Sequence, residues 1–160
     1  MEAEKTACRL VQALKAKNLH ISTAESCTGG MIAAAITDVS GASSVFELGV
    51  VSYSNEIKNQ VLGVRAETLA KYTVYSAETA AEMVCGVIRL GGADLAVAVT
   101  GLAGPNGGTA EKPVGLVYVA VGNEENLQVR EFHFAGGRAE IRRQTVENAL
   151  QMALEYVEDL

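Results

Sequence analysis

The chain reads Ala24-Glu25-Ser26-Cys27-Thr28-Gly29-Gly30 between an apolar run, which includes Leu19 and Ile21, and a helical pattern of small residues. This context predicts a strand, a tight turn and a helix. Ser26 would then project from the end of a strand beside the positive end of a helix, where free N–H groups favour developing negative charge. A serine that attacks a carbonyl needs this geometry. On these seven residues alone, a Ser or Thr helix cap followed by a glycine turn is the more common explanation.

Length and composition narrow the class of protein. The 160 residues are 49% hydrophobic and 20% charged, which predicts one globular domain over residues 1–160 with a substantial core. A net charge of -6 argues against general binding to nucleic acid or to a membrane surface. No apolar run reaches the length of a membrane span, and the first residues lack the order of a signal peptide.

Cysteine and histidine usage limits the available chemistry. The three cysteines are odd in number and far apart, which suits a reduced cytoplasm and shows no zinc spacing. We therefore expect a cytoplasmic protein. The two histidines, His20 and His133, are isolated, so the sequence offers few side chains for a His-based catalytic triad or a His-ligated metal site.

Hydrophobic periodicity alternates between helical and strand patterns along the chain. We expect helices at 7–14, 29–38, 55–62, 67–72, 76–91 and from about 141 to 157, and strands at 19–23, 45–53, 95–99, 115–122 and 128–134. Strands interleaved with helices predict an α/β fold, a three-layer α/β/α sandwich. The last two strands follow each other closely, so they should form an antiparallel pair within a mixed, mostly parallel sheet.

A second informative stretch is Ser52-Tyr53-Ser54-Asn55-Glu56-Ile57-Lys58. If a helix begins after Ser54, Lys58 lies about one turn into it and Tyr53 lies at the strand end. A lysine near a serine can act as its base when burial or a neighbour lowers the lysine pKa. The alternative is a solvated helical lysine paired with Glu56.

A glycine-rich loop, residues 100–109, leaves the C-terminal end of a buried strand, where ligands bind in open α/β sheets. Its glycines could present N–H groups to a phosphate or carboxylate. The spacing is neither the dinucleotide fingerprint nor a P-loop, because no helix follows and no Gly-Lys-Ser/Thr ends it. A long glycine turn without a ligand is an equal alternative.

A fourth stretch is Gly136-Gly137-Arg138, followed by Arg142 and Arg143. Arg138 and Arg142 share a helical face near the helix N-terminus. Cations there oppose the helix dipole, which hints at an anionic partner such as a phosphate. A surface cluster offset by Glu140 and Glu147 explains these arginines as well.

In this order and at these spacings, the four stretches resemble the C-terminal domain of the competence/damage-inducible CinA proteins. The matching segments are 23–30, Gly49 with 52–58, 62–64, 100–105, 107–108, 112–115, and Phe134, Gly137, Arg138 and 142–143. The stand-alone members of this family are nicotinamide-nucleotide amidohydrolases. The resemblance covers nearly the whole chain, and the segments Ala24–Gly30 and Tyr53–Lys58 make it specific.

The resemblance implies a hydrolase that deamidates nicotinamide mononucleotide to nicotinate mononucleotide and ammonia, in pyridine nucleotide recycling. It implies Ser26 as the nucleophile, with Lys58 and Tyr53 as activating partners, and no metal or other cofactor. We expect the N–H groups of Thr28, Gly29 and Gly30 to stabilise the oxyanion. For the remaining substrate contacts we name the following candidates: Thr100, Gly101, Gly104, Gly107, Gly108 and Arg142, the last for the ribose phosphate.

The last expectations concern the binding partner and the assembly of this chain. The expected partner is a small nucleotide substrate, with no nucleic acid and no membrane, and the expected assembly is a homo-oligomer. A catalytically silent nucleotide-binding or regulatory module is the competing function, and Cys27 is the competing nucleophile. The chain departs from the family pattern at 73–77, where Tyr75 is bulkier than the usual Val and Ala77 replaces a Glu. That departure predicts a changed pocket shape or subunit contact.

Overall fold

The computed structural model describes residues 2–160. In chain order its elements are α1 (Glu2–Lys17), β1 (Ile21–Glu25), α2 (Met31–Thr37), the short 3-10 helix η1 (Ala42–Ser44), β2 (Phe46–Val51), α3 (Asn55–Leu62), α4 (Ala66–Tyr72), α5 (Ala77–Gly91), β3 (Leu95–Gly101), β4 (Leu116–Gly122), β5 (Leu127–His133) and α6 (Arg138–Glu158). Each predicted helix and strand is present, with most ends shifted by a residue or two.

The five strands form one sheet in the order β2-β1-β3-β4-β5. β1 pairs in parallel with both β2 and β3, while β4 is antiparallel to β3 and to β5. Four strands therefore run one way and β4 runs the other. This confirms the predicted α/β fold with a mixed, mostly parallel sheet and an antiparallel pair at the C-terminal edge.

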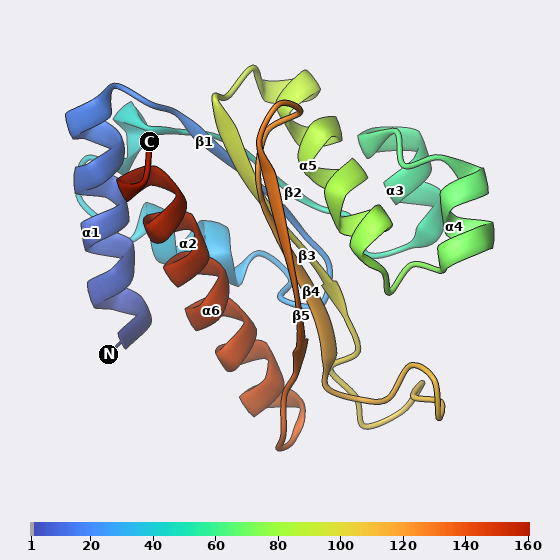
Figure 1. The fold of residues 1–160 in the computed structure, drawn as a ribbon. Coiled ribbons are helices and arrows are strands. Elements are labelled where there is room, and N and C mark those ends of the chain that lie inside the picture. The colour runs from blue at the N-terminus through green and yellow to red at the C-terminus, as the bar shows by residue number, and fades with distance from the viewer. Residues whose placement is uncertain (1) are drawn as a thin grey trace.

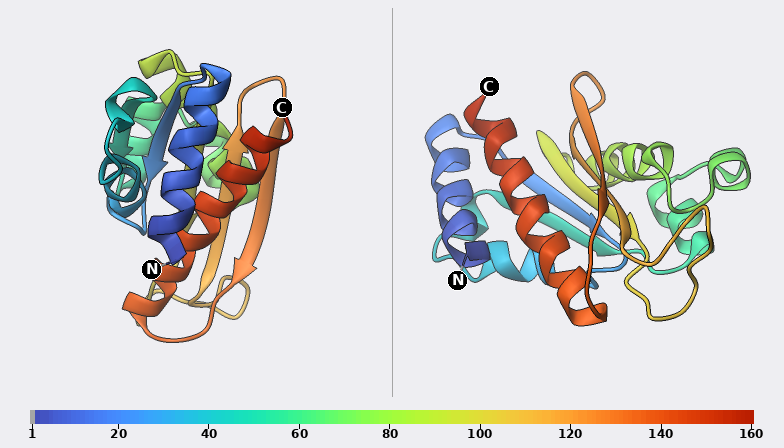
Figure 2. Two further views of the ribbon diagram at one scale, coloured as in Figure 1. Left: turned by 90° about the vertical axis from the view of Figure 1, so that its left-hand side faces the viewer. Right: turned by 60° about the horizontal axis from the view of Figure 1, so that its bottom comes forward.

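Helices cover both faces of the sheet (Figures 1 and 2). α1, α2 and α6 lie on one face, and α5 lies on the other with α3 and α4 beyond it. The alternation of side chains along β3 builds both cores: Val97 and Val99 pack toward the first group, whereas Ala96 and Ala98 pack toward α5. The small alanines let the α5 backbone lie close to the sheet, so the three-layer sandwich is well packed.

Gly86 fixes how α3 sits against α5. A Cβ at Gly86 would lie 1.9 Å from the carbonyl oxygen of Leu62, the last residue of α3. Only glycine permits this approach of backbone to helix. The contact holds α3 beside the C-terminal ends of β1 and β2, and this position carries Lys58 into the site described next.

Candidate active site

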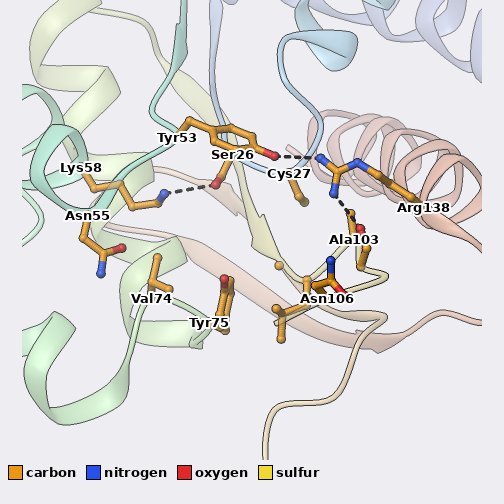
Figure 3. Close-up of a pocket in the computed structure, with 13 residues that line it drawn as sticks. Ser26, Cys27, Tyr53, Asn55, Lys58, Val74, Tyr75, Ala103, Asn106 and Arg138 are labelled. Atoms are coloured by element: carbon orange, nitrogen blue, oxygen red, sulfur yellow. Dashed lines mark hydrogen bonds between the residues drawn. The ribbon is translucent and has the colours of Figure 1, made fainter. Parts of the chain in front are cut away.

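Ser26 follows directly on β1 and begins the turn toward α2. It is 8% exposed, and its hydroxyl oxygen accepts a hydrogen bond from Nζ of Lys58 at 3.1 Å. The turn lies at the carboxyl ends of the parallel strands, the edge at which α/β folds place ligands. Figure 3 shows the two side chains pointing toward each other.

Lys58 reaches Ser26 because α3 begins where the sequence predicts. The Ser54 hydroxyl caps the helix by accepting from the N–H of Ile57 at 3.2 Å, so Lys58 lies one turn in. Lys58 is 1% exposed, and its Nζ also donates to the Ser52 carbonyl at 2.7 Å. The alternative of a solvated lysine paired with Glu56 is therefore wrong. Among residues 2–160, no carboxylate forms an ion pair with Lys58.

Burial lowers the pKa of Lys58 to about 8, and nearby Cys27 opposes this only in part. Burial penalises the charged ammonium, and no carboxylate offsets the penalty. A minor fraction of Lys58 is thus neutral near physiological pH, whereas an ordinary lysine is almost entirely charged there. A neutral amine within hydrogen-bond distance of a serine hydroxyl can accept its proton.

Cys27 lies next to Ser26 in the same turn and also lines the pocket. Cys27 is 4% exposed, and this burial is the main reason why the pKa of its thiol is raised to about 11. The thiolate, which is the reactive form, is therefore scarce at neutral pH. This environment favours Ser26 over Cys27 as the attacking group.

The side chain of Glu25, the last residue of β1, lies at the N-terminus of α2, where a Ser or Thr helix cap was the simpler interpretation of the sequence. Its buried carboxylate accepts from the Thr28 hydroxyl at 2.6 Å and from the N–H groups of Ile32 and Ala33 at 2.9 and 3.0 Å. The N-cap residue is Gly30, with φ of 104°, and no Ser or Thr side chain caps the helix. The first-turn N–H groups at Ile32 and Ala33 are consequently used by the protein itself.

The expected oxyanion donors lie in the turn between Ser26 and α2. The N–H of Gly29 donates to the Ser26 carbonyl at 3.0 Å, and Thr28, Gly29 and Gly30 lie outside the pocket lining. Cys27 does line the pocket, and within residues 2–160 its N–H makes no hydrogen bond to another residue. The N–H of Cys27 is therefore a further candidate donor beside those that the sequence suggests.

A pocket of about 150 Å³ surrounds the Ser26–Lys58 pair (Figure 3). Its lining comes from the turn after β1, the start of α3, the segment before α5, the loop after β3 and the first residue of α6: Ser26, Cys27, Tyr53, Asn55, Lys58, Val74, Tyr75, Gly101, Leu102, Ala103, Gly104, Asn106 and Arg138. Segments far apart in the chain thus converge on one serine.

Tyr53 lies on the rim of this pocket and is 61% exposed. Its hydroxyl accepts from Nη2 of Arg138 at 3.0 Å. It has no hydrogen bond to Ser26 or Lys58, so the structure offers no direct contact for the activating role expected of it. The arrangement instead joins Tyr53 to Arg138 across the pocket mouth (Figure 3).

The glycine-rich loop contributes fewer residues than expected. Gly101 and Gly104 line the pocket, whereas Gly107 and Gly108 do not. A Cβ at Gly101 would lie 2.7 Å from the Leu116 carbonyl oxygen, so packing against β4 already requires glycine there. Thr100 is fully buried outside the pocket lining and donates to the Val74 carbonyl at 3.0 Å.

The arginines divide into three roles. Arg138 lines the pocket and donates to the Gly104 carbonyl at 2.8 Å as well as to Tyr53. Arg142, the expected phosphate ligand, lies outside the lining, and its guanidinium donates to the carbonyl oxygens of residues 27 and 28 at 3.0 and 3.3 Å. Arg143 pairs with Glu140 and Glu147 on the surface, as the alternative predicted.

Four lining side chains were not among the expected catalytic or substrate-binding residues, although each falls in a stretch that the sequence analysis singled out. Asn55 lies three residues before Lys58, inside a stretch that was already informative. Asn106 lies in the glycine-rich loop 100–109, and Val74 and Tyr75 lie in the segment 73–77 that departs from the family pattern. The bulky Tyr75 was the signal for a changed pocket shape, and the structure does place it in the pocket lining.

Neither a metal-binding cluster nor a membrane-spanning helix is found among the described residues. Within residues 2–160, no group of three or more His, Cys, Asp or Glu side chains is placed to hold a metal ion. None of the helices in that range combines the length and hydropathy needed to cross a bilayer.

Comparison with known proteins identifies the family of this chain. Residues 3–157 match the family model of the CinA C-terminal domain. A relative in Acetivibrio thermocellus, whose name refers to competence-damage induction, is 56% identical over 140 residues, which cover 88% of this chain and 34% of that protein. The chain spans about a third of the length of the curated relatives it matches.

Solved structures match over nearly the full length. The competence/damage inducible protein CihA from Agrobacterium tumefaciens has a TM-score of 0.93 and 45% identity, covering 97% of this chain and 96% of that one. A CinA superfamily protein from Klebsiella pneumoniae has a TM-score of 0.95 and 35% identity, covering 99% of both chains. The chain belongs to the CinA C-terminal domain family.

Proposed function

We propose that this chain deamidates nicotinamide mononucleotide, with Ser26 as the nucleophile and Lys58 as its base. The observation that carries the proposal is the 3.1 Å hydrogen bond between Nζ of Lys58 and the Ser26 hydroxyl inside the pocket. Lys58 is buried without a carboxylate partner, and its lowered pKa keeps part of it neutral. Such a lysine is suited to removing a proton from serine.

The reaction then proceeds as acyl transfer. The Ser26 oxygen attacks the carboxamide carbon while Nζ of Lys58 takes the hydroxyl proton. The resulting ammonium gives this proton to the departing nitrogen, the carbon–nitrogen bond breaks, and ammonia leaves. Water attacks the Ser26 ester with Lys58 again accepting a proton, and nicotinate mononucleotide is released. The net change is amide and water to carboxylate and ammonium.

The oxyanion of each tetrahedral intermediate needs a donor close to Ser26. The N–H of Cys27 is the donor that we assign, because Cys27 directly follows the nucleophile and lines the pocket. One such donor typically contributes about 3–4 kcal/mol to transition-state stabilisation. Arg142 supports this donor by holding the carbonyl oxygens of residues 27 and 28.

The phosphate of the substrate is assigned to Arg138 and not to Arg142. Arg138 is the first residue of α6 and lines the pocket at its mouth, opposite the Ser26–Lys58 pair in Figure 3. The α6 N-terminus has no side-chain cap, so its N–H groups and dipole also favour an anion there. Together they support a binding mode with the phosphate at the mouth and the carboxamide beside Ser26.

Ammonia release tests the proposal directly. Purified protein would be incubated with nicotinamide mononucleotide, nicotinamide riboside and nicotinamide, with Ser26→Ala as the inactive reference. We expect ammonia and nicotinate mononucleotide from the nucleotide, and at least about tenfold lower kcat/KM with the riboside, since a charge-assisted arginine–phosphate contact contributes about 1.5–3 kcal/mol. Binding of the nucleotide without ammonia release would instead favour the silent nucleotide-binding module.

A further inference from the structure

Thr73 holds a backbone conformation that side-chain-bearing residues rarely adopt. Its φ is 69° and its ψ is 171°, a region used almost only by glycine. The next two residues, Val74 and Tyr75, both line the pocket. A strained residue directly before two pocket-lining side chains needs surroundings that hold it in place.

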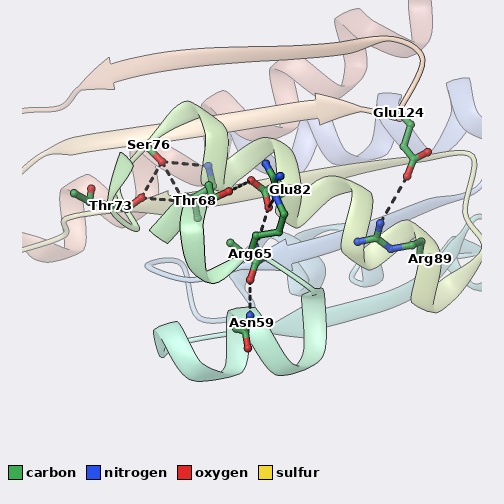
Figure 4. A network of polar contacts seen from close by, with 10 residues as sticks. Asn59, Arg65, Thr68, Thr73, Ser76, Glu82, Arg89 and Glu124 are labelled. Atoms are coloured by element: carbon green, nitrogen blue, oxygen red, sulfur yellow. Dashed lines mark hydrogen bonds and ion pairs between the residues drawn. The ribbon is translucent and has the colours of Figure 1, made fainter. Parts of the chain in front are cut away.

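The surroundings hold this segment through all three of its carbonyl oxygens. The hydroxyls of Ser76 and Thr79 donate to the Thr73 carbonyl, each at 2.9 Å. Thr100 donates to the Val74 carbonyl at 3.0 Å, and Lys112 donates to the Tyr75 carbonyl at 2.8 Å. Figure 4 shows the part of this network at Thr73 and Ser76. The segment 73–75 is therefore a rigid wall, anchored to α5, β3 and the loop before β4.

Tyr75 is the aromatic side chain on this wall. It is half-buried, and within residues 2–160 its hydroxyl has no hydrogen-bond partner and its ring has no aromatic or cationic neighbour. In the view of Figure 3 it lies across the open space from Ser26. An aromatic ring that lines a pocket on an anchored backbone segment, without a partner of its own, has its contact surface available to a ligand.

We propose that Tyr75 is a specificity-determining residue that selects a flat, positively charged pyridinium ring through aromatic contact. This inference rests on the proposed function, since the amide-bearing ring must lie between Ser26 and the opposite wall. Aromatic pairs attract beyond their buried area, and an aromatic face also attracts a cation. The N-substituted pyridinium of nicotinamide mononucleotide has both properties. Its reduced dihydro form keeps the amide, ribose and phosphate but loses both.

The test compares these two ligands by calorimetry in the Ser26→Ala background, where neither is consumed. We expect Tyr75→Val to raise the Kd of the oxidised nucleotide about 3- to 10-fold and that of the reduced form less than twofold. Tyr75→Phe should keep both Kd values within twofold. Tyr72→Val is the matched control, because Tyr72 is exposed on α4 and does not line the pocket.

The outcomes separate this inference from the proposed function. Equal changes for the two ligands, no change for either, or a loss in Tyr75→Phe as large as in Tyr75→Val would each overturn the role of the Tyr75 ring. Ammonia release by the parent protein, together with unchanged Kd values for both ligands in Tyr75→Val, would refute this inference alone. Binding by the parent without ammonia release would refute the proposed function, while the comparison of the Tyr75 variants would still decide the specificity. Failure of both ligands to bind would refute both.

Discussion

Replacing Lys58 with methionine should remove activity and at the same time stabilise the protein at neutral pH. Burial lowers the Lys58 pKa from 10.5 to about 8, which corresponds to about 3 kcal/mol of unfolding free energy that the buried charge costs below pH 8. Methionine fills similar space without a charge, but the variant loses two hydrogen bonds, to Ser26 and Ser52, worth about 1 kcal/mol each. The net gain at pH 7 is therefore about 1 kcal/mol.

The sign of the pH dependence gives the sharper test. Between pH 8 and 10.5 the unfolded chain holds the Lys58 proton and the folded chain does not, so the stability of the parent rises with pH in this window. Cys27 acts in the opposite direction, because its raised pKa makes the folded state less stable from about pH 9 upward. Both proteins contain Cys27, so the difference between parent and variant reports mainly on Lys58.

Urea unfolding followed by circular dichroism at pH 7, 8, 9 and 10 measures this difference. The parent should gain about 2–3 kcal/mol relative to Lys58→Met across the series. Lys5→Met, which changes an exposed lysine on α1, should follow the parent. Parallel curves for parent and Lys58→Met would refute the reasoning, because the Lys58 pKa would then not be lowered and almost no neutral amine would be present at neutral pH to accept the serine proton.

Three other predictions follow from the same site. Ser26→Ala should abolish ammonia release with an unchanged circular dichroism spectrum while Cys27→Ser keeps most activity, and the reverse result would exchange the two roles. In steady-state assays, Arg138→Ala should raise the KM of the nucleotide about tenfold and leave the KM of the riboside unchanged. Arg142→Ala should instead lower kcat for both substrates. Equal effects of the two variants would contradict the assignment of the phosphate to Arg138. Thr73→Gly should raise the unfolding free energy by up to about 1 kcal/mol, since relief of about 1–3 kcal/mol of strain exceeds the added backbone entropy, and a loss of stability measured in urea would mean that Thr73 is not strained.

The fold could be predicted because its signals are local. Ser54 and Ser76 cap α3 and α5 as expected, and Gly92 ends α5 in the left-handed conformation. The uninterrupted apolar run at 95–99 is a strand buried on both faces. Each of these features depends on residues within a few positions of one another, so a single sequence contains the information.

The site was less accessible because its properties arise from packing. The family resemblance paired Ser26 with Lys58, but the burial of Lys58, which is 1% exposed, arises only in the folded chain. Arg142 and Arg138 are equivalent on a helical wheel, yet only Arg138 reaches the pocket, because Arg142 binds the backbone after Ser26. Tyr75 comes from a loop whose position is set by distant side chains.

The placement of Glu25 explains how Lys58 can remain partly neutral, although the buried carboxylate of Glu25 belongs to the residue directly before Ser26, which Lys58 contacts. The Glu25 oxygens are satisfied by Thr28 and by two N–H groups of α2, and Glu25 is not among the groups that shift the Lys58 pKa. A carboxylate directed at Lys58 instead would favour its charged form and remove the base. The same contacts tie the turn of Ser26 to α2. One buried acid thus orders the nucleophile's turn, and the direction of its side chain leaves Lys58 able to accept a proton.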